Sequence, residues 1–161
     1  MLHRTVINTG DRIKTAFTLA EMLIAVLFLG IFAYIAVPRM QTSIIERYKG
    51  KSAAQKIVTD LRLVRNLAIT EAADNTAGFA LQMAGTSPYS GYTIVNLSNG
   101  HTISTHTLDT KISCSGGILF KFGPMGNLLA GSDTQLVISA AEKSSTIGIT
   151  AATGAVQCVE N

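Results

Sequence analysis

The chain is poor in the residues that build metal centres and catalytic sites. Its 161 residues include two cysteines, three histidines and no tryptophan. Cys114 and Cys158 stand in neither a C-x-x-C pair nor a metal-ligand pattern. The histidines are His3, His101 and His106, and the last two are five residues apart on an expected strand, which turns them to opposite faces. We therefore expect surface histidines, no metal, no cofactor and no enzyme activity.

Other signatures of catalysis are also missing. The serines on either side of Cys114 have no obvious base near them in the sequence. Gly116-Gly117 and Gly123–Gly126 are expected to be turns, because neither lies between a strand and a helix as a phosphate-binding loop does. The acids of the C-terminal half are scattered and lack the spacing of a calcium loop. An anchored enzyme is therefore disfavoured.

Excess charge of either sign is small. The net charge of the whole chain is +3, and three of the basic residues lie among the first 16. Beyond residue 16, ten basic and nine acidic side chains remain. A nearly neutral surface argues against a general binder of polyanions, so nucleic acid is not an expected partner.

A long apolar run dominates the N-terminal part. The 22 residues from Phe17 to Pro38 would span about 33 Å as a helix, enough for the core of a bilayer. Glu21 is the only charged residue in the run. One acid in a membrane helix costs about 2.5–3.5 kcal/mol on insertion scales, so a partner for this charge is expected.

Three interpretations of this run compete. A secretory signal peptide has an apolar region of about 7–15 residues and an A-x-A-like site behind it, whereas this run is longer and no such site closes it. The second interpretation is a plain membrane anchor. The third is a prepilin-type signal.

The third interpretation comes from a resemblance. Ala16-Phe17-Thr18-Leu19-Ala20-Glu21 resembles the Gly-Phe-Thr-Leu-x-Glu motif of type IV pilins and type II secretion pseudopilins, with Ala16 in place of Gly. The resemblance implies a leader at residues 1–16. Prepilin peptidase would cut between Ala16 and Phe17 and methylate the new amino terminus.

The resemblance also assigns a role to Glu21. It implies that Glu21 pairs with the amino terminus of Phe17 in a neighbouring subunit and so sets the register of a filament. The first turn of a helix also favours a carboxylate through the helix dipole. An acid that reaches out to the membrane interface remains the alternative.

Residues 39 to 73 are predicted to continue the helix. Apolar residues recur with helical spacing at Ile57, Leu61, Val64, Ala68 and Ala72, while Lys56, Asp60, Arg62 and Arg65 are expected on other faces. Pro38 removes one helical hydrogen bond, so we expect it to bend or loosen the helix there.

The C-terminal half reads as short strands separated by turns rich in Gly, Pro, Ser and Asn. We expect an α+β fold in which one long helix, half membrane segment and half amphipathic, packs on antiparallel sheets as in pilins. The expected strands are Ala77–Met83, Gly91–Leu97, His101–Thr107, Ile118–Phe122, Thr134–Ser139, Ser145–Thr150 and Ala155–Val159.

A second resemblance covers this half. Leu119–Gly126, Gln135–Ser139 and Thr146–Val156 resemble the C-terminal pattern of H-type minor pseudopilins and T-type minor pilins, and Ala53–Ala72 resembles the helix of that branch. This implies a minor pseudopilin of the type II secretion system, assembled into a short filament that drives protein export. The implied partners are prepilin peptidase, other pseudopilin or pilin subunits, the assembly platform of the inner membrane and the lipid bilayer.

Topology follows from the resemblance rather than from charge. Basic residues flank the apolar run on both sides, so the positive-inside rule is ambiguous. The implied location is a single pass through the inner membrane, with residues 39–161 periplasmic or extracytoplasmic. Cys114 and Cys158 would then tend to form a disulfide, with two separate thiols as the alternative.

A minor type IV pilin involved in pilus assembly or DNA uptake is the alternative function. DNA binding needs clustered Lys or Arg on an exposed tip or tail. After Lys121 only Lys143 is basic, so we favour the secretion system.

Overall fold

The structure, a computed structural model, describes residues 18–161, without the side chains of residues 37–43. It divides into two compact units, one that ends at Met40 and a second from Gln41 to Asn161. The first helix, α1 (Leu19–Thr70), contributes to both units, and eight strands follow it. These are β1 (Phe79–Ala84), β2 (Gly91–Asn96), β3 (Thr102–Thr107), β4 (Ser113–Gly116), β5 (Leu119–Phe122), β6 (Gln135–Ala140), β7 (Lys143–Thr150) and β8 (Ala155–Glu160). The α+β class is confirmed.

The N-terminal part of α1 is apolar on all sides. Its segment Leu19–Ala36 has a mean hydropathy of 2.4, and none of it is buried within the protein. By length and composition this is one helix that could cross a membrane. The expected apolar helix is confirmed to that extent.

The second part of α1 packs on the sheets through a stripe of buried residues. Ile57, Leu61, Val64 and Ala68 are fully buried, as their helical spacing predicts. The helix ends at Thr70, a few residues before the predicted end near Ala73.

A turn built around Asn75 follows the helix. The backbone N–H of Asn75 still donates to Glu71 O over 2.8 Å, while its side chain bonds to both the N–H and the carbonyl of Gly78 at 2.9 Å. A buried Asn that satisfies the chain around it in this way favours a turn over a further helical turn.

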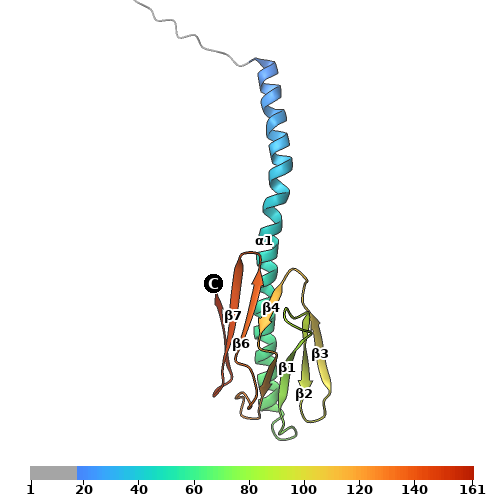
Figure 1. Ribbon diagram of the computed structural model, residues 1–161, viewed down its shortest axis with the longest axis vertical. Helices are drawn as coiled ribbons and strands as arrows, with labels where there is room; N and C mark the ends of the chain where they lie inside the picture. The colour runs from blue at the N-terminus through green and yellow to red at the C-terminus, as the bar shows by residue number, and fades with distance from the viewer. Residues whose placement is uncertain (1–17) are drawn as a thin grey trace, which may run out of the picture. The chain divides into compact units, whose positions relative to one another are not determined.

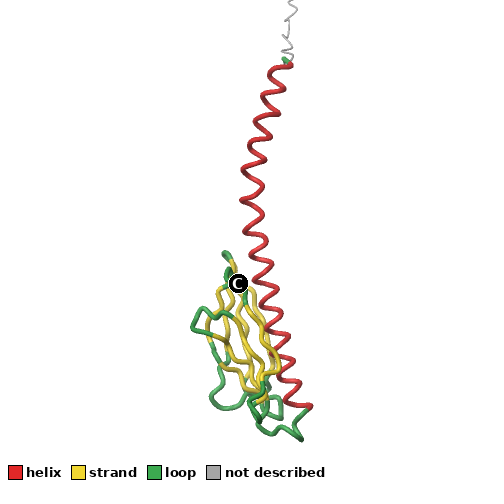
Figure 2. Tube along the Cα trace, turned by 90° about the vertical axis from the view of Figure 1, so that its right-hand side faces the viewer, coloured by secondary structure: helices red, strands yellow, loops and turns green. Residues whose placement is uncertain are grey.

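Two four-stranded antiparallel sheets lie against α1 in the second unit (Figures 1 and 2). The strand orders are β3-β2-β1-β5 in the first sheet and β4-β6-β7-β8 in the second. Phe79, Phe120 and Tyr92 from the first sheet and Leu136 and Ile147 from the second are almost completely buried, in one hydrophobic core with α1. The core is therefore formed by α1 and both sheets together.

All seven predicted strands are present, with ends shifted by at most two residues. Strand β4 is not expected from the sequence, because its residues Ser113–Gly116 include no β-branched or aromatic side chain. It forms because its register with β6 pairs Cys114 with Ile138, and both side chains fill the core. Long-range pairing decides the conformation of such a segment, and local propensity does not.

Candidate functional site

Glu21 lies in a reciprocal cap at the start of α1. The backbone N–H of Glu21 donates to Thr18 Oγ1 at 3.3 Å, and Glu21 Oε2 accepts from the backbone N–H of Thr18 at 3.4 Å. This is a capping box, in which two backbone donors that lack helical partners are satisfied. Ala16 and Phe17, the predicted cleavage site, lie outside the described residues.

The apolar segment of α1 has no partner within the described chain. Its large side chains are between about half and four fifths exposed. They include Leu19, Met22, Leu23, Ile24, Val26, Leu27, Phe28, Leu29, Ile31, Phe32 and Ile35. A continuous apolar surface of this kind needs lipid or protein around it, because water alone leaves it aggregation-prone.

Pro38 lies inside α1, which is helical on both sides of it. A bend at this position stays a prediction.

Four ion pairs connect the segment 46–51 of α1 to loops and strands from both sheets. In the loop between β3 and β4, Lys111 Nζ lies 2.9 Å from a Glu46 carboxylate oxygen, and Asp109 lies 2.8 Å from Lys49 Nζ. Arg47 and Lys51 pair with Glu142 and Glu160 of the second sheet at 3.4 and 2.7 Å. Ion pairs at the surface add little to stability.

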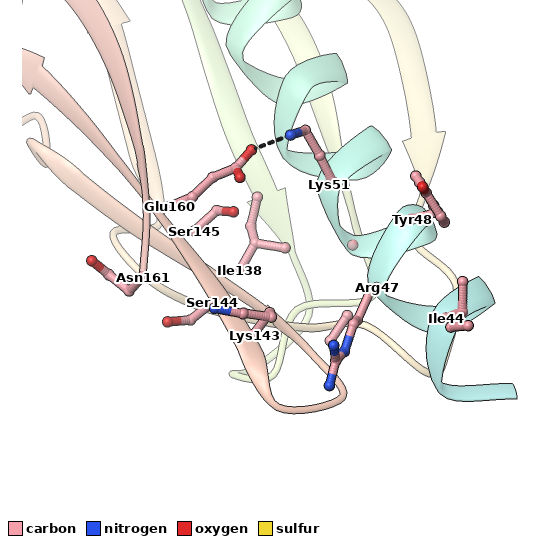
Figure 3. Close-up of a pocket in the computed structure, with 12 residues that line it drawn as sticks. Ile44, Arg47, Tyr48, Lys51, Ile138, Lys143, Ser144, Ser145, Glu160 and Asn161 are labelled. Carbon is pink, nitrogen blue, oxygen red and sulfur yellow. Dashed lines mark ion pairs between the residues drawn. The ribbon is translucent and has the colours of Figure 1, made fainter. Parts of the chain in front are cut away.

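A cavity of about 360 Å³ opens beside this segment (Figure 3). Gly50 is buried there, and a Cβ on it would collide with the Ala140 side chain, so the helix can approach β6 closely only because residue 50 is glycine. The other lining residues are Ile44, Arg47, Tyr48, Lys51, Ile138, Lys143, Ser144, Ser145, Glu160 and Asn161.

The chemistry of this cavity is mixed. The hydrogen bond to Glu160 raises the pKa of Lys51, so the Lys51 ammonium stays charged at neutral pH. The lining combines aliphatic, hydroxyl and charged groups but contains no cysteine or histidine. It therefore offers apolar, hydroxyl and charged groups for contact.

A buried polar cluster joins α1 to the first sheet. Tyr92 donates its hydroxyl to Asp60 Oδ2 over 2.5 Å, and the same oxygen lies 3.6 Å from both Lys56 Nζ and His106 Nε2. The rings of Tyr92 and His106 are 5.1 Å apart. Burial first, and then the bond to Asp60, raise the pKa of Tyr92 far above its usual value, so the phenol stays protonated.

Two expectations are corrected by this cluster. Asp60 was expected on a polar face of the helix but is only 8% exposed. His106 was expected on the surface, whereas its side chain is 29% exposed and faces Asp60. The sequence carried a signal for Asp60: it stands three residues after Ile57 and one before Leu61, within the apolar stripe.

His101 does lie on the surface, in the turn before β3. Within residues 18–161 there is no group of three or more His, Cys, Asp or Glu side chains that could hold a metal ion.

Cys114 and Cys158 do not form the disulfide considered from the sequence. Both are free, with Cys114 buried and Cys158 exposed. They lie on β4 and β8, the opposite edges of one sheet with β6 and β7 between them. Three strand spacings are about 14 Å, twice the largest separation that a disulfide bridges.

No protein-family model, curated protein or solved structure matches this chain. Its function therefore has to be inferred from its own residues.

Proposed function

We propose that this chain is a minor pseudopilin of the type II secretion system, a pilin-like subunit that is anchored in the inner membrane and assembles into a short filament. The observation that carries the proposal is the composition of α1. A wholly exposed apolar segment with a single acid in its first turn is followed in the same helix by an amphipathic segment that packs on two sheets.

The two parts of α1 have separate roles in this proposal. The apolar segment Leu19–Ala36 is held by the lipid bilayer before assembly and by neighbouring subunits in the filament. Glu21 gives the register by pairing with the methylated amino terminus of Phe17 in the next subunit. The unit Gln41–Asn161 is carried on the helix and contacts neighbours outside the membrane.

The charges of the second unit support protein contacts over DNA uptake. Arg47, Lys49, Lys51 and Lys111 are each paired with a carboxylate of the same chain. Phosphate binding would have to compete with these carboxylates, whereas proteins that bind DNA tightly present unpaired basic clusters.

Mass spectrometry of the membrane-extracted chain tests the proposal. The chain would be expressed with and without prepilin peptidase, and its intact mass and N-terminal sequence measured. We expect a mature chain that begins at methylated Phe17 only when the peptidase is present. Ala16→Gly is the matched variant and should be cut at least as completely. An uncut chain in both cases would leave a plain membrane anchor.

Cys158 offers an independent test of the membrane topology. Its thiol is exposed, whereas Cys114 is buried. A membrane-impermeant maleimide should label Cys158 in cells with a permeabilised outer membrane and an intact inner membrane, and Cys158→Ala should abolish the signal. Labelling only after the inner membrane is broken would place the domain in the cytoplasm and contradict the proposal.

A further inference from the structure

The four edges of the two sheets differ in whether their outward backbone groups have partners. At β5, Lys121 donates to Ser132 Oγ over 3.1 Å and accepts from Leu129 over 2.9 Å. Leu119 donates to Asp133 Oδ2 over 3.0 Å and accepts from the Asp133 N–H over 2.8 Å. This edge is therefore closed by the loop that follows it.

The β4 edge is covered at its carbonyls. The backbone N–H of Tyr89 donates to Cys114 O over 2.8 Å, and the Tyr89 hydroxyl donates to Gly116 O over 2.7 Å. One residue thus satisfies both outward carbonyls of this strand and links it to the loop between β1 and β2.

The β8 edge is largely open. The backbone N–H of Asn161 donates to Ser144 O of β7 over 2.9 Å. In an antiparallel pair, alternate residues of a strand bond to the neighbouring strand. The backbone groups of Val156, Cys158 and Glu160 therefore point away from β7. Arg62 covers Val156 O at 3.2 Å, which agrees with this assignment. Within residues 18–161, the backbone groups of Cys158 and Glu160 have no partner on that side.

The β3 edge is open too. The backbone N–H of Leu108 donates to Ser90 O over 2.8 Å. By the same alternation, the backbone groups of Ser104 and His106 bond to β2. The backbone groups of Thr105 and Thr107 therefore face outward. No partner for these outward groups exists in the described part of the chain. Neither β3 nor β8 contains Lys or Pro, the residues that commonly protect an edge.

The two open edges run in the same direction relative to α1. Along β8, Val156 lies at Arg62 and Glu160 at Lys51, so this strand is antiparallel to the helix. Along β3 the chain passes from His106 beside Asp60 to Asp109 beside Lys49, again antiparallel to the helix. Two copies with parallel helices would therefore present β8 and β3 as parallel strands.

The side-chain faces agree with a parallel pairing. Val156 is buried, and Glu160 pairs with Lys51 of the helix, so both side chains point toward the helix side of their sheet. Cys158 lies between them in the strand at a spacing of two residues, so its side chain points to the same side. In a parallel pair, a residue whose backbone groups point toward the partner strand lies beside one whose backbone groups point away from it. The backbone groups of Cys158 point out of its own sheet, and those of Ser104 and His106 point toward β2. Cys158 would therefore lie beside Ser104 or His106. His106 also faces the helix. The α1 helices of both copies would then lie on one side of a joined sheet.

We propose that β8 of one copy of this chain adds in parallel to β3 of a second copy, so that adjacent subunits share one continuous sheet. Each copy has one edge of each kind, so the contact is heterologous and extends into a row. Parallel α1 helices are what insertion into one membrane in one orientation requires, and in that respect the inference rests on the proposed function. Antiparallel pairing of the same edges would point the helices in opposite directions.

Cysteine crosslinking in membranes that contain the full chain tests this pairing. Ser104→Cys and Thr105→Cys would each be combined with native Cys158 and oxidised with copper phenanthroline. Parallel pairing predicts several-fold more covalent dimer, and a ladder of larger species, for Ser104→Cys than for Thr105→Cys. The unsubstituted chain gives the background from Cys158 alone. A preference for Thr105→Cys would indicate antiparallel pairing and overturn the proposal, as would equal yields or no dimer above background.

A proline variant tests the edge without disturbing the fold. Thr105→Pro removes an outward N–H that β2 does not use, so folding should be retained while strand addition is blocked. Combined with Ser104→Cys, it should reduce the crosslink to background with little change in melting temperature. A retained crosslink would overturn the proposal.

Cleavage at Phe17 measured on the same samples separates the two proposals. Cleavage without the crosslink would refute the shared sheet and leave the pseudopilin assignment intact, whereas the crosslink on an uncut chain would refute the assignment alone.

Discussion

The Tyr92 hydroxyl donates to Asp60 Oδ2 over 2.5 Å, and this bond joins β2 to α1 at a point where both side chains are buried. A hydrogen bond to a buried carboxylate has two consequences. It makes the position of the helix on the sheet specific, and it leaves a buried acceptor short of a donor when the phenol is removed.

Tyr92→Phe should therefore destabilise the chain by about 1.5–3 kcal/mol, since it removes a hydrogen bond to a charged group and keeps the ring. The free energy of unfolding in detergent, measured by urea titration, would show the loss. Tyr48→Phe is the matched control, because Tyr48 is 71% exposed, and should stay within about 0.5 kcal/mol of the unsubstituted chain. Equal effects of the two variants would mean that the Asp60 bond adds no stability.

Cys114 should make the fold sensitive to alkaline pH. Burial raises the pKa of its thiol from 9.0 to about 11, so the folded chain keeps a proton that the unfolded chain loses. The free energy of unfolding keeps its full value below pH 9. It falls as the pH rises from 9 toward 11, by about 1.4 kcal/mol per pH unit and about 2–3 kcal/mol in total.

Urea titrations between pH 8 and pH 11 would show this fall in the free energy of unfolding. Cys114→Ala should remove the part of the pH dependence that comes from ionisation of the Cys114 thiol. Cys158→Ala should keep most of it, because that thiol is exposed. A pH dependence that is the same in all three chains would refute the assignment to Cys114.

Gly50→Ala should destabilise the second unit although alanine is the better helix former. The added methyl group would collide with the Ala140 side chain, and overpacking of this kind costs about 1–3 kcal/mol against a helix gain of about 1 kcal/mol. The double variant Gly50→Ala with Ala140→Gly should recover part of the loss in melting temperature. Gly148→Ala, where an added Cβ meets nothing within 4 Å, is the control for a tolerated methyl group.

Glu21 variants should separate charge pairing from helix capping. Glu21→Gln keeps an oxygen that can accept the Thr18 bonds and removes the charge, whereas Glu21→Ala removes both. If the charge sets filament register, both variants should insert into the membrane and fail to co-assemble with other subunits. Crosslinking into filaments would measure this, and normal assembly of Glu21→Gln would leave the cap as the only role supported for Glu21.

Local sequence patterns were enough to locate the helix and all strands but β4. Twenty-two residues with one charge define an apolar helix, and the spacing of Ile57, Leu61, Val64 and Ala68 defines the buried stripe that follows. Alternation and turn residues located seven strands to within two residues. These features are local, because helix and strand periods repeat within a few residues.

Contacts between distant segments depend on the three-dimensional arrangement of these elements. It buried Asp60 under Tyr92, made a strand of the small polar residues of β4, and placed Cys114 and Cys158 at opposite edges of one sheet. It also closed the β5 edge, covered the outward carbonyls of the β4 edge and left β3 and β8 open. The place of Asp60 within the apolar stripe already indicated its burial, but the other outcomes depend on strand order and register between segments far apart in the chain, which no local pattern encodes.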